Sequence, residues 1–254
     1  MSTSTTNRKD LVRKLLKGIE TGDPESAAVV NEEKYIQHNP QTREGGEGLA
    51  QLFKRISKSN PKVNLVRAFQ DGDFVFGHTE YDFSTRRIGF EVFRFEGNQA
   101  VEHWDNIQPR QPKNELGLEM VDGPKQACDL DKTEANRKFV RDFAQIVFVD
   151  GNLDKIGDFV SSDSFTQYSP YIPAVGGSEG ITQWLDGGKV KYTRIHRVLT
   201  EGSFCLVVSE GTLNDVHTSF YDLYRVSEGK ITEHWDTIES VPPKSEWKNN
   251  NGKF

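Results

Sequence analysis

Residues 101–107 read VEHWDNI and residues 232–238 read TEHWDTI, so one short sequence occurs twice, 131 residues apart. The segment YIQHNP at 35–40 likewise aligns with FTQYSP at 165–170, at an offset of 130. A period this long belongs to whole domains, because solenoid repeats are only about 20–50 residues long. The sequence therefore predicts a tandem duplication of one complete domain.

The chain between the two copies differs from both in composition. Residues 108–132 contain three prolines and two glycines without a sustained hydrophobic period, which is typical of a linker or of a strap over the surface. The predicted boundaries are 1–115 for the first domain, 116–129 for the linker, 130–240 for the second domain and 241–254 for a C-terminal tail. The tail is expected to be a loose end, on which Trp247 could still dock.

Composition excludes several classes of protein. The 254 residues carry 32 Lys+Arg against 38 Asp+Glu, a net charge of −6, which argues against nucleic-acid binding. No apolar stretch is long enough to span a membrane and the first ten residues lack the apolar region of a secretory signal, so we expect a cytoplasmic protein with no membrane partner. Cys128 and Cys205 lie far apart in dissimilar surroundings, which argues against a disulfide framework or a cysteine-rich metal site.

Each copy shows the same order of predicted elements. A helix opens it, with one apolar face formed by Leu11, Leu15, Leu16 and Ile19 in the first copy and by Phe139, Phe143, Ile146 and Val147 in the second. Two further helices follow, the last beginning near Glu47 or Glu179. Four strands joined by short turns come next, at about 62–70, 73–81, 87–95 and 99–107, and again at 189–199, 203–212, 216–226 and 230–238. Helices followed by an antiparallel meander define an α+β unit.

Strand alternation predicts a pocket on one face of the first sheet. We expect that face to collect an aromatic and apolar lining, namely Phe74, Phe76, Phe93, Phe95, Val101 and Ile107. The same face would carry five ionisable groups: His78, Glu80, Glu91, His103 and Asp105. Burial in such a cup raises the pKa of a carboxyl group and lowers that of a histidine, which suits both for proton transfer near neutral pH.

With the YIQHNP and EHWD segments at these places in the order of elements, both halves of the chain resemble the NTF2-like superfamily. Within it they resemble the SnoaL-like branch, named for polyketide cyclases that catalyse intramolecular aldol condensation. The resemblance implies two tandem cone-shaped domains, each a curved antiparallel sheet wrapped around N-terminal helices, with a small-molecule pocket and no cofactor. It also implies that the two domains pair as a pseudo-dimer within one chain, so that we expect a monomer.

The resemblance assigns roles residue by residue. Asp105 corresponds to the acid or base of the cyclases, Glu91 to a group that donates to a developing enolate, and Asn39 to a substrate contact. The candidate catalytic residues are Asp105, Glu91, His103, Asn39 and His38. The candidate ligand contacts are Tyr35, His78, Glu80, Phe76 and Phe93 in the first domain and Tyr168, Asp222, His234 and Asp236 in the second.

Each of these residues also has a structural interpretation. His103 and Asp105 could form a hydrogen-bonded pair, and Glu80 or Glu91 could pair with a nearby arginine. A metal site built from His38, His78, His103 and Asp105 lacks compact ligand spacing, so we expect none. The second domain has Tyr168 in place of His38, Ser169 in place of Asn39 and Val208 in place of His78, so the two pockets cannot be chemically identical.

Three functions remain open from the sequence. The first is cofactor-independent acid/base chemistry on a small hydrophobic carbonyl compound, by aldol cyclisation, isomerisation or dehydration. The second is non-catalytic binding of a hydrophobic ligand, with the first pocket the more competent, and the third is a pairing module with filled cups. An Asp105 or Glu91 locked in an ion pair away from a cavity would argue against the first.

Overall fold

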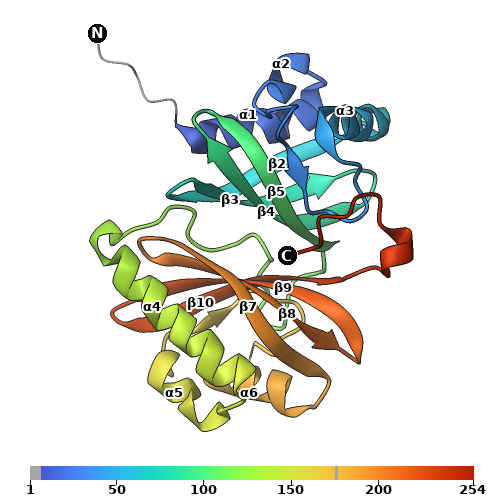
Figure 1. Ribbon diagram of the computed structural model, residues 1–254. Helices are drawn as coiled ribbons and strands as arrows, with labels where there is room; N and C mark the ends of the chain where they lie inside the picture. The colour runs from blue at the N-terminus through green and yellow to red at the C-terminus, as the bar shows by residue number, and fades with distance from the viewer. Residues whose placement is uncertain (1–6, 175–176) are drawn as a thin grey trace. The chain divides into compact units, whose positions relative to one another are not determined.

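The computed structural model describes residues 7–174 and 177–254 and divides the chain into two compact units. Unit 1 comprises Met1–Pro109 together with Pro242–Phe254, and unit 2 comprises Arg110–Val241. Each is an α+β unit with its helices on one face of a five-stranded sheet (Figure 1). Within the described ranges, every helix is too short or too polar to cross a membrane.

The helices of unit 1 precede its long strands, as predicted. They are α1 (Arg8–Thr21), α2 (Pro24–Ala27) and α3 (Gly45–Ile56), with the short strand β1 (Ile36–Gln37) between the last two. The Asn7 side chain caps α1 by accepting from the Lys9 N–H, and Gly22 ends the helix in the left-handed conformation. One face of α1 is buried against the sheet, through Val12, Leu15, Leu16 and Ile19.

The sheet of unit 1 has the strand order β1-β5-β4-β3-β2. Its long strands are β2 (Lys62–Asp71), β3 (Phe74–Asp82), β4 (Arg86–Glu96) and β5 (Gln99–Pro109), which pair antiparallel. β1 adds to β5 in parallel, with Gln37 opposite His103. This parallel pair brings the YIQHNP segment beside the EHWD segment.

Unit 2 repeats the arrangement. Its helices are α4 (Thr133–Phe143), which continues as the π-helical segment η3 (Ala144–Val149), α5 (Ile156–Phe159) and α6 (Ser178–Asp186). Its strands are β6 (Thr166–Gln167), β7 (Val190–Glu201), β8 (Phe204–Leu213), β9 (Val216–Ser227) and β10 (Lys230–Ser240). Their order, β6-β10-β9-β8-β7, is that of unit 1, as a duplication requires.

The register of β3 corrects the predicted faces of unit 1. Gly77 lies opposite Glu91 and Val75 opposite Phe93, so these residues share the inner face, the one covered by the helices. The alternate residues of β3 lie on the outer face, namely Phe74, Phe76, His78 and Glu80. Their predicted place beside Glu91 was wrong. Aromatic content could not choose the face because both faces are buried: Phe76 and Phe93 are 0% and 2% exposed.

The tail, residues 242–254, is not the loose end that the sequence suggested. It lies along the YIQHNP segment of unit 1, where Asn249 Nδ2 donates to Asn39 O at 2.7 Å and to Thr42 O at 2.9 Å. Asn251 Nδ2 donates to Gln37 O at 3.0 Å. Composition did not predict this role, because a polar segment rich in asparagine is also typical of a disordered chain end.

The connector, residues 110–129, occupies the comparable place in unit 2. Asn114 Nδ2 donates to Gln167 O at 2.7 Å, as Asn251 does to Gln37 O in unit 1, and Trp235 Nε1 donates to Asp122 O at 2.9 Å. Gly123 has a φ of +87° and a Cβ there would lie 2.7 Å from the Trp235 ring. The segment that follows the last strand of each copy thus belongs to the other unit.

Candidate functional site

Three ionisable side chains meet on the inner face of unit 1, on the adjacent strands β4 and β5. Glu91 lies opposite Asp105 in the strand register, and His103 precedes Asp105 by two residues. His103 Nε2 lies 2.8 Å from Glu91 Oε2, and the Tyr81 hydroxyl donates to Glu91 Oε1 at 2.8 Å. All are almost fully buried, so the cluster is a polar network inside the aromatic cup.

Gln37 determines where the histidine proton lies. The Asn39 N–H donates to Gln37 Oε1 at 2.8 Å, and an amide NH₂ in that position could not accept this bond. The same oxygen lies 3.0 Å from His103 Nδ1, which must therefore carry a proton. Nε2 and Glu91 then share one further proton, either as imidazolium with carboxylate or as imidazole with carboxylic acid.

Asp105 is held from two sides. Asn39 Nδ2 donates to Asp105 Oδ2 at 2.7 Å, and the Lys253 ammonium of the tail lies 3.4 Å from Asp105 Oδ1. Lys253 is 3% exposed and Asp105 4%, so this is a buried ion pair. The sequence predicted Asn39 beside Asp105 only through the family resemblance, and nothing in it predicted Lys253.

Unit 2 has the corresponding cluster on β9 and β10, but a different side chain donates to its aspartate. His234 Nε2 lies 3.0 Å from Asp222 Oδ1, and His234 Nδ1 lies 2.9 Å from Gln167 Oε1, which also accepts from the Ser169 N–H. The proton arrangement of unit 1 is therefore reproduced. The Ser169 hydroxyl donates to Asp236 Oδ2 at 2.7 Å, in the place of the Asn39 amide.

The surroundings of Asp236 change its acidity. Burial raises the pKa of Asp236 to about 6, because the charged form loses its hydration. His234 opposes this rise in the pKa and the Asp222 charge adds to it. A carboxyl group with a pKa near 6 exchanges protons readily at neutral pH.

Tyr35 and Phe93 join the cluster of unit 1, where the sequence placed them. Phe93 stacks on His103 with ring centroids 4.4 Å apart, and Tyr35 lies parallel to the same ring at 6.4 Å. Burial raises the pKa of Tyr35, as do the nearby charges of Glu91 and Asp105. These contacts define the aromatic lining.

His38 and Tyr168 belong to the outer faces instead. His38 stacks on Trp104 at 4.6 Å, and its Nε2 lies 2.9 Å from Glu102 Oε1. Tyr168 stacks on Trp235 at 4.7 Å in the same manner. The predicted grouping of His38 with Asp105 and of Tyr168 with Asp236 was wrong, because each residue alternates with the inward glutamine that precedes it.

His78 and Glu80 are also separated from the cluster. His78 Nδ1 lies 2.7 Å from an Arg67 nitrogen on the outer face, and burial lowers the pKa of His78. Glu80 pairs in register with Ile88 rather than with Glu91. Neither residue faces Asp105.

Two groups among the described residues could hold a cation, and they are these same clusters. The ligand atoms of Glu91, His103 and Asp105 lie within 4.8 Å of one another, and so do those of Asp222, His234 and Asp236. In unit 1 the Lys253 ammonium already supplies a positive charge beside Asp105. Cofactor-free chemistry remains the prediction.

Sequence reasoning missed the glutamines that orient the histidines. Gln37 and Gln167 are identical at corresponding positions of YIQHNP and FTQYSP, although the residues after them differ. Identity between the copies at an otherwise variable place was therefore a usable signal. Tyr81 and Lys253 gave no such signal.

The comparisons with known proteins agree with this architecture. Residues 140–234, which lie in unit 2, match the family model of the SnoaL-like domain. No match was found among curated proteins.

Solved structures similar to part of the chain include three with 16–19% identity. An NTF2-like protein of unknown function from Cytophaga hutchinsonii is 19% identical, with a TM-score of 0.36, and the match covers 43% of this chain and 96% of that one. IdmH from Streptomyces antibioticus, provisionally named a polyketide cyclase, is 16% identical with a TM-score of 0.36, over 40% and 92% of the chains. A protein from Kribbella flavida, provisionally named a ketosteroid isomerase, is 16% identical with a TM-score of 0.38, over 44% and 84%.

The fold class follows from the family match and the topology together. Residues 140–234 of unit 2 match the SnoaL-like family model, and unit 1 has the same strand order and the same order of helices. The chain consists of two tandem α+β units of the same topology, the second of which matches the SnoaL-like family model.

Proposed function

We propose that the protein binds small hydrophobic carbonyl compounds and transfers protons on them, with unit 2 as the catalytic unit. Asp236 is the general base, and the Tyr224 hydroxyl donates to the carbonyl oxygen. This develops the cofactor-independent chemistry that the resemblance implies, and moves it from Asp105 to the corresponding residue of unit 2. The observation that carries the proposal is the buried Asp236 carboxyl beside His234 in an aromatic setting.

Tyr224 supports a carbonyl ligand. Its ring is fully buried and stacks on His234 at 4.7 Å, and its hydroxyl has no hydrogen-bond partner among the described residues. Burial raises the pKa of Tyr224, so the hydroxyl stays protonated and remains a donor. A buried hydroxyl without a partner loses free energy that a ligand oxygen would restore. The corresponding residue of unit 1 is Phe93, which has no hydroxyl.

The three reactions considered share one first step. The Asp236 carboxylate takes a proton from the carbon next to the carbonyl, the C–H electron pair forms a C=C bond, and the carbonyl electrons move to the oxygen. The Tyr224 hydroxyl donates to the resulting enolate oxygen. In cyclisation, the enolate carbon attacks a second carbonyl, whose oxygen takes the proton from Asp236. In isomerisation, a conjugated enolate takes that proton at a different carbon, and in dehydration the β-hydroxyl group takes it and leaves as water.

For unit 1, one observation favours the non-catalytic alternative. The Lys253 ammonium lies 3.4 Å from Asp105 Oδ1 within the buried network, so the carboxylate that would act as the base is already engaged in an ion pair. Unit 1 is then the binding or pairing module, contrary to the expectation that its pocket is the more competent.

Hydrogen exchange at carbon tests the proposal without the natural substrate. The full chain is incubated with 2-tetralone in D₂O, and deuterium incorporation beside the carbonyl is followed by NMR. We expect D236N to slow the exchange by about 100-fold or more, and Y224F by a similar factor, because each removes a group used in proton transfer. The rate in the wild type should rise with pH through about 6, as Asp236 ionises.

The matched control is D105N, which removes the corresponding carboxylate of unit 1 and should leave the exchange rate unchanged. Circular dichroism of each variant verifies that it is folded. Undiminished exchange in D236N, or no exchange above the buffer rate in the wild type, would overturn the proposal.

A further inference from the structure

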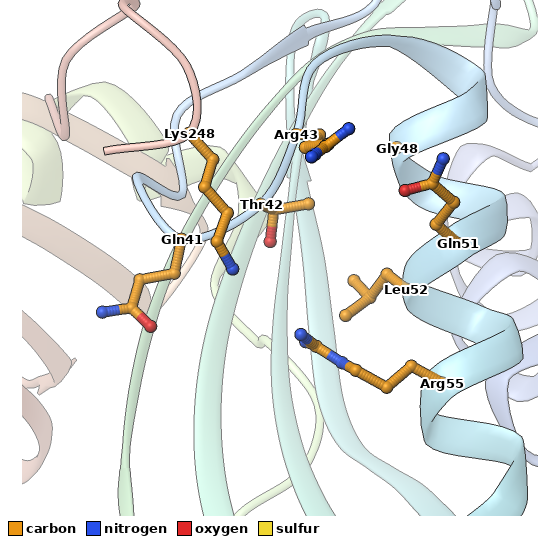
Figure 2. A pocket seen from close by; sticks show the side chains of 8 residues that line it. All are labelled: Gln41, Thr42, Arg43, Gly48, Gln51, Leu52, Arg55 and Lys248. Atoms are coloured by element: carbon orange, nitrogen blue, oxygen red, sulfur yellow. The ribbon is translucent and has the colours of Figure 1, made fainter. Parts of the chain in front are cut away.

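Unit 1 has a hollow that lies apart from the acid/base cluster. Its volume is about 310 Å³, which suits a small molecule, and Asp105, Glu91 and His103 are not among the residues that line it. Its walls come from three segments: the loop after β1, the helix α3 and the tail (Figure 2). No sequence pattern indicated it, because its outermost lining residues, Gln41 and Lys248, are 207 residues apart in the chain.

The hollow collects positive charge. Arg43 comes from the loop, Arg55 from the last turn of α3 and Lys248 from the tail. Figure 2 shows the Lys248 and Arg55 side chains extending into the hollow from different segments, with Leu52 beside Arg55 on the same helix. Among the residues that the structure describes, none forms an ion pair with the side chains of these three cations.

Hydrogen-bonding groups and one apolar side chain complete the lining. Gln41 and Gln51 each contribute an amide that can donate or accept, and Leu52 contributes an apolar surface. Guanidinium groups bind carboxylate and phosphate oxygens in pairs, and an ammonium adds a compact point charge. The set of side chains is therefore suited to an anionic head attached to a small organic body.

The tail fixes the position of its cation. The Lys248 N–H donates to Pro40 O at 2.8 Å, and the neighbouring Asn249 is anchored on Asn39 O and Thr42 O. Three like charges held close together repel one another, and a bound anion removes that repulsion. The main-chain anchors thus hold Lys248 where an anion would gain from it.

We propose that this hollow is a binding site for a small organic anion, whose carboxylate or phosphate group contacts Arg43, Arg55 and Lys248. The proposal goes beyond the proton transfer assigned to unit 2 and does not depend on it. Arg55 belongs to α3 and Lys248 to the tail, so an anion bound by both side chains also holds the tail against α3. A carboxylate and a phosphate group would use the same three cations, and the test below distinguishes between them.

Calorimetric titration of the full chain with citrate and with inorganic phosphate, at low ionic strength, tests the site. We expect at least one of the two to bind, and R55Q and K248Q each to weaken that binding tenfold or more. The matched control is K58Q, which removes an exposed cation three residues beyond Arg55 and should change the affinity less than twofold. All three residues are exposed, so the variants should keep the melting temperature of the wild type.

The comparison of probes identifies the ligand chemistry: citrate alone indicates a carboxylate, and phosphate alone a phosphate ester. Three results would overturn the proposal. The first is that neither probe binds the wild type. The second is that R55Q and K248Q bind the probe as tightly as the wild type does. The third is that K58Q loses as much affinity as R55Q, which would show a general charge effect. None of these results bears on the exchange of 2-tetralone.

Discussion

Corresponding aspartates in the two units differ in what surrounds them. Asp105 accepts from the Asn39 amide and lies beside the Lys253 ammonium, whereas Asp236 accepts from the Ser169 hydroxyl. In the second setting burial, and then the Asp222 charge, raise the pKa of Asp236. The contacts thus differ by one substitution, Ser169 at the position of Asn39, and by one lysine from a distant segment.

Asp236 should make the protein less stable at neutral pH than it could be. Its pKa is about 6 in the folded protein against 3.8 for an ordinary aspartate, so the folded state holds the proton more tightly and stability falls as the pH rises between these values. The difference corresponds to about 3 kcal/mol once both states are ionised. D236N should therefore raise the free energy of unfolding by up to this amount at pH 7.

Urea unfolding of D236N and the wild type between pH 3.5 and pH 8, in steps of roughly half a unit, measures this effect. The gain should be absent below about pH 4 and complete above about pH 6. A gain that is the same at every pH would show that the substitution acts through packing and not through the charge.

At the scale of the elements, the sequence did not predict that the tail docks on unit 1. Hydrophobic periodicity predicted the four long strands of each copy to within two residues at either end, and it predicted the apolar face of the first helix. The tail has no such face, and its binding depends on asparagine side chains that contact main-chain oxygens. Strand faces failed for a related reason: β3 is buried on both sides, so alternation marks no inner side.

Asn249 should contribute strongly to the docking of the tail. It is buried and donates to two main-chain oxygens, which would be left without partners in N249A. We expect a loss of about 2 kcal/mol in the free energy of unfolding of unit 1, measured by urea titration. N250A changes the exposed neighbour and is the matched control, expected within about 0.5 kcal/mol of the wild type. Equal losses in the two variants would contradict a specific role for Asn249.

At the scale of the whole molecule, the two units each include a segment that follows the other copy. The tail follows β10 but belongs to unit 1, and the connector follows β5 but belongs to unit 2. The predicted boundaries follow the repeat, while the compact units do not. A sequence repeat shows what was duplicated, and side-chain bonds such as Asn114 to Gln167 O decide where each segment packs.

Cutting the chain near the start of the tail tests whether the tail belongs to unit 1. A protease recognition sequence placed in the exposed turn at Lys244–Glu246 permits cleavage in the folded protein. We expect the released segment to stay bound through gel filtration. The urea midpoint of unit 1 should then depend on protein concentration, because reassembly has become bimolecular. Immediate loss of the segment with no change in the midpoint would show that the tail adds nothing to unit 1.

The reciprocal segments also impose an order on biosynthesis. The last strand of unit 1 ends at Pro109, but its closing segment begins at Pro242, which the ribosome adds 133 residues later. During translation unit 1 lacks its closing segment, and Asp105 lacks the Lys253 ammonium, until the last residues are made. In unit 2 the order is reversed, because its connector is made before its first helix. Translation that stops just after Val241 therefore leaves every residue of unit 2 made and unit 1 without its closing segment.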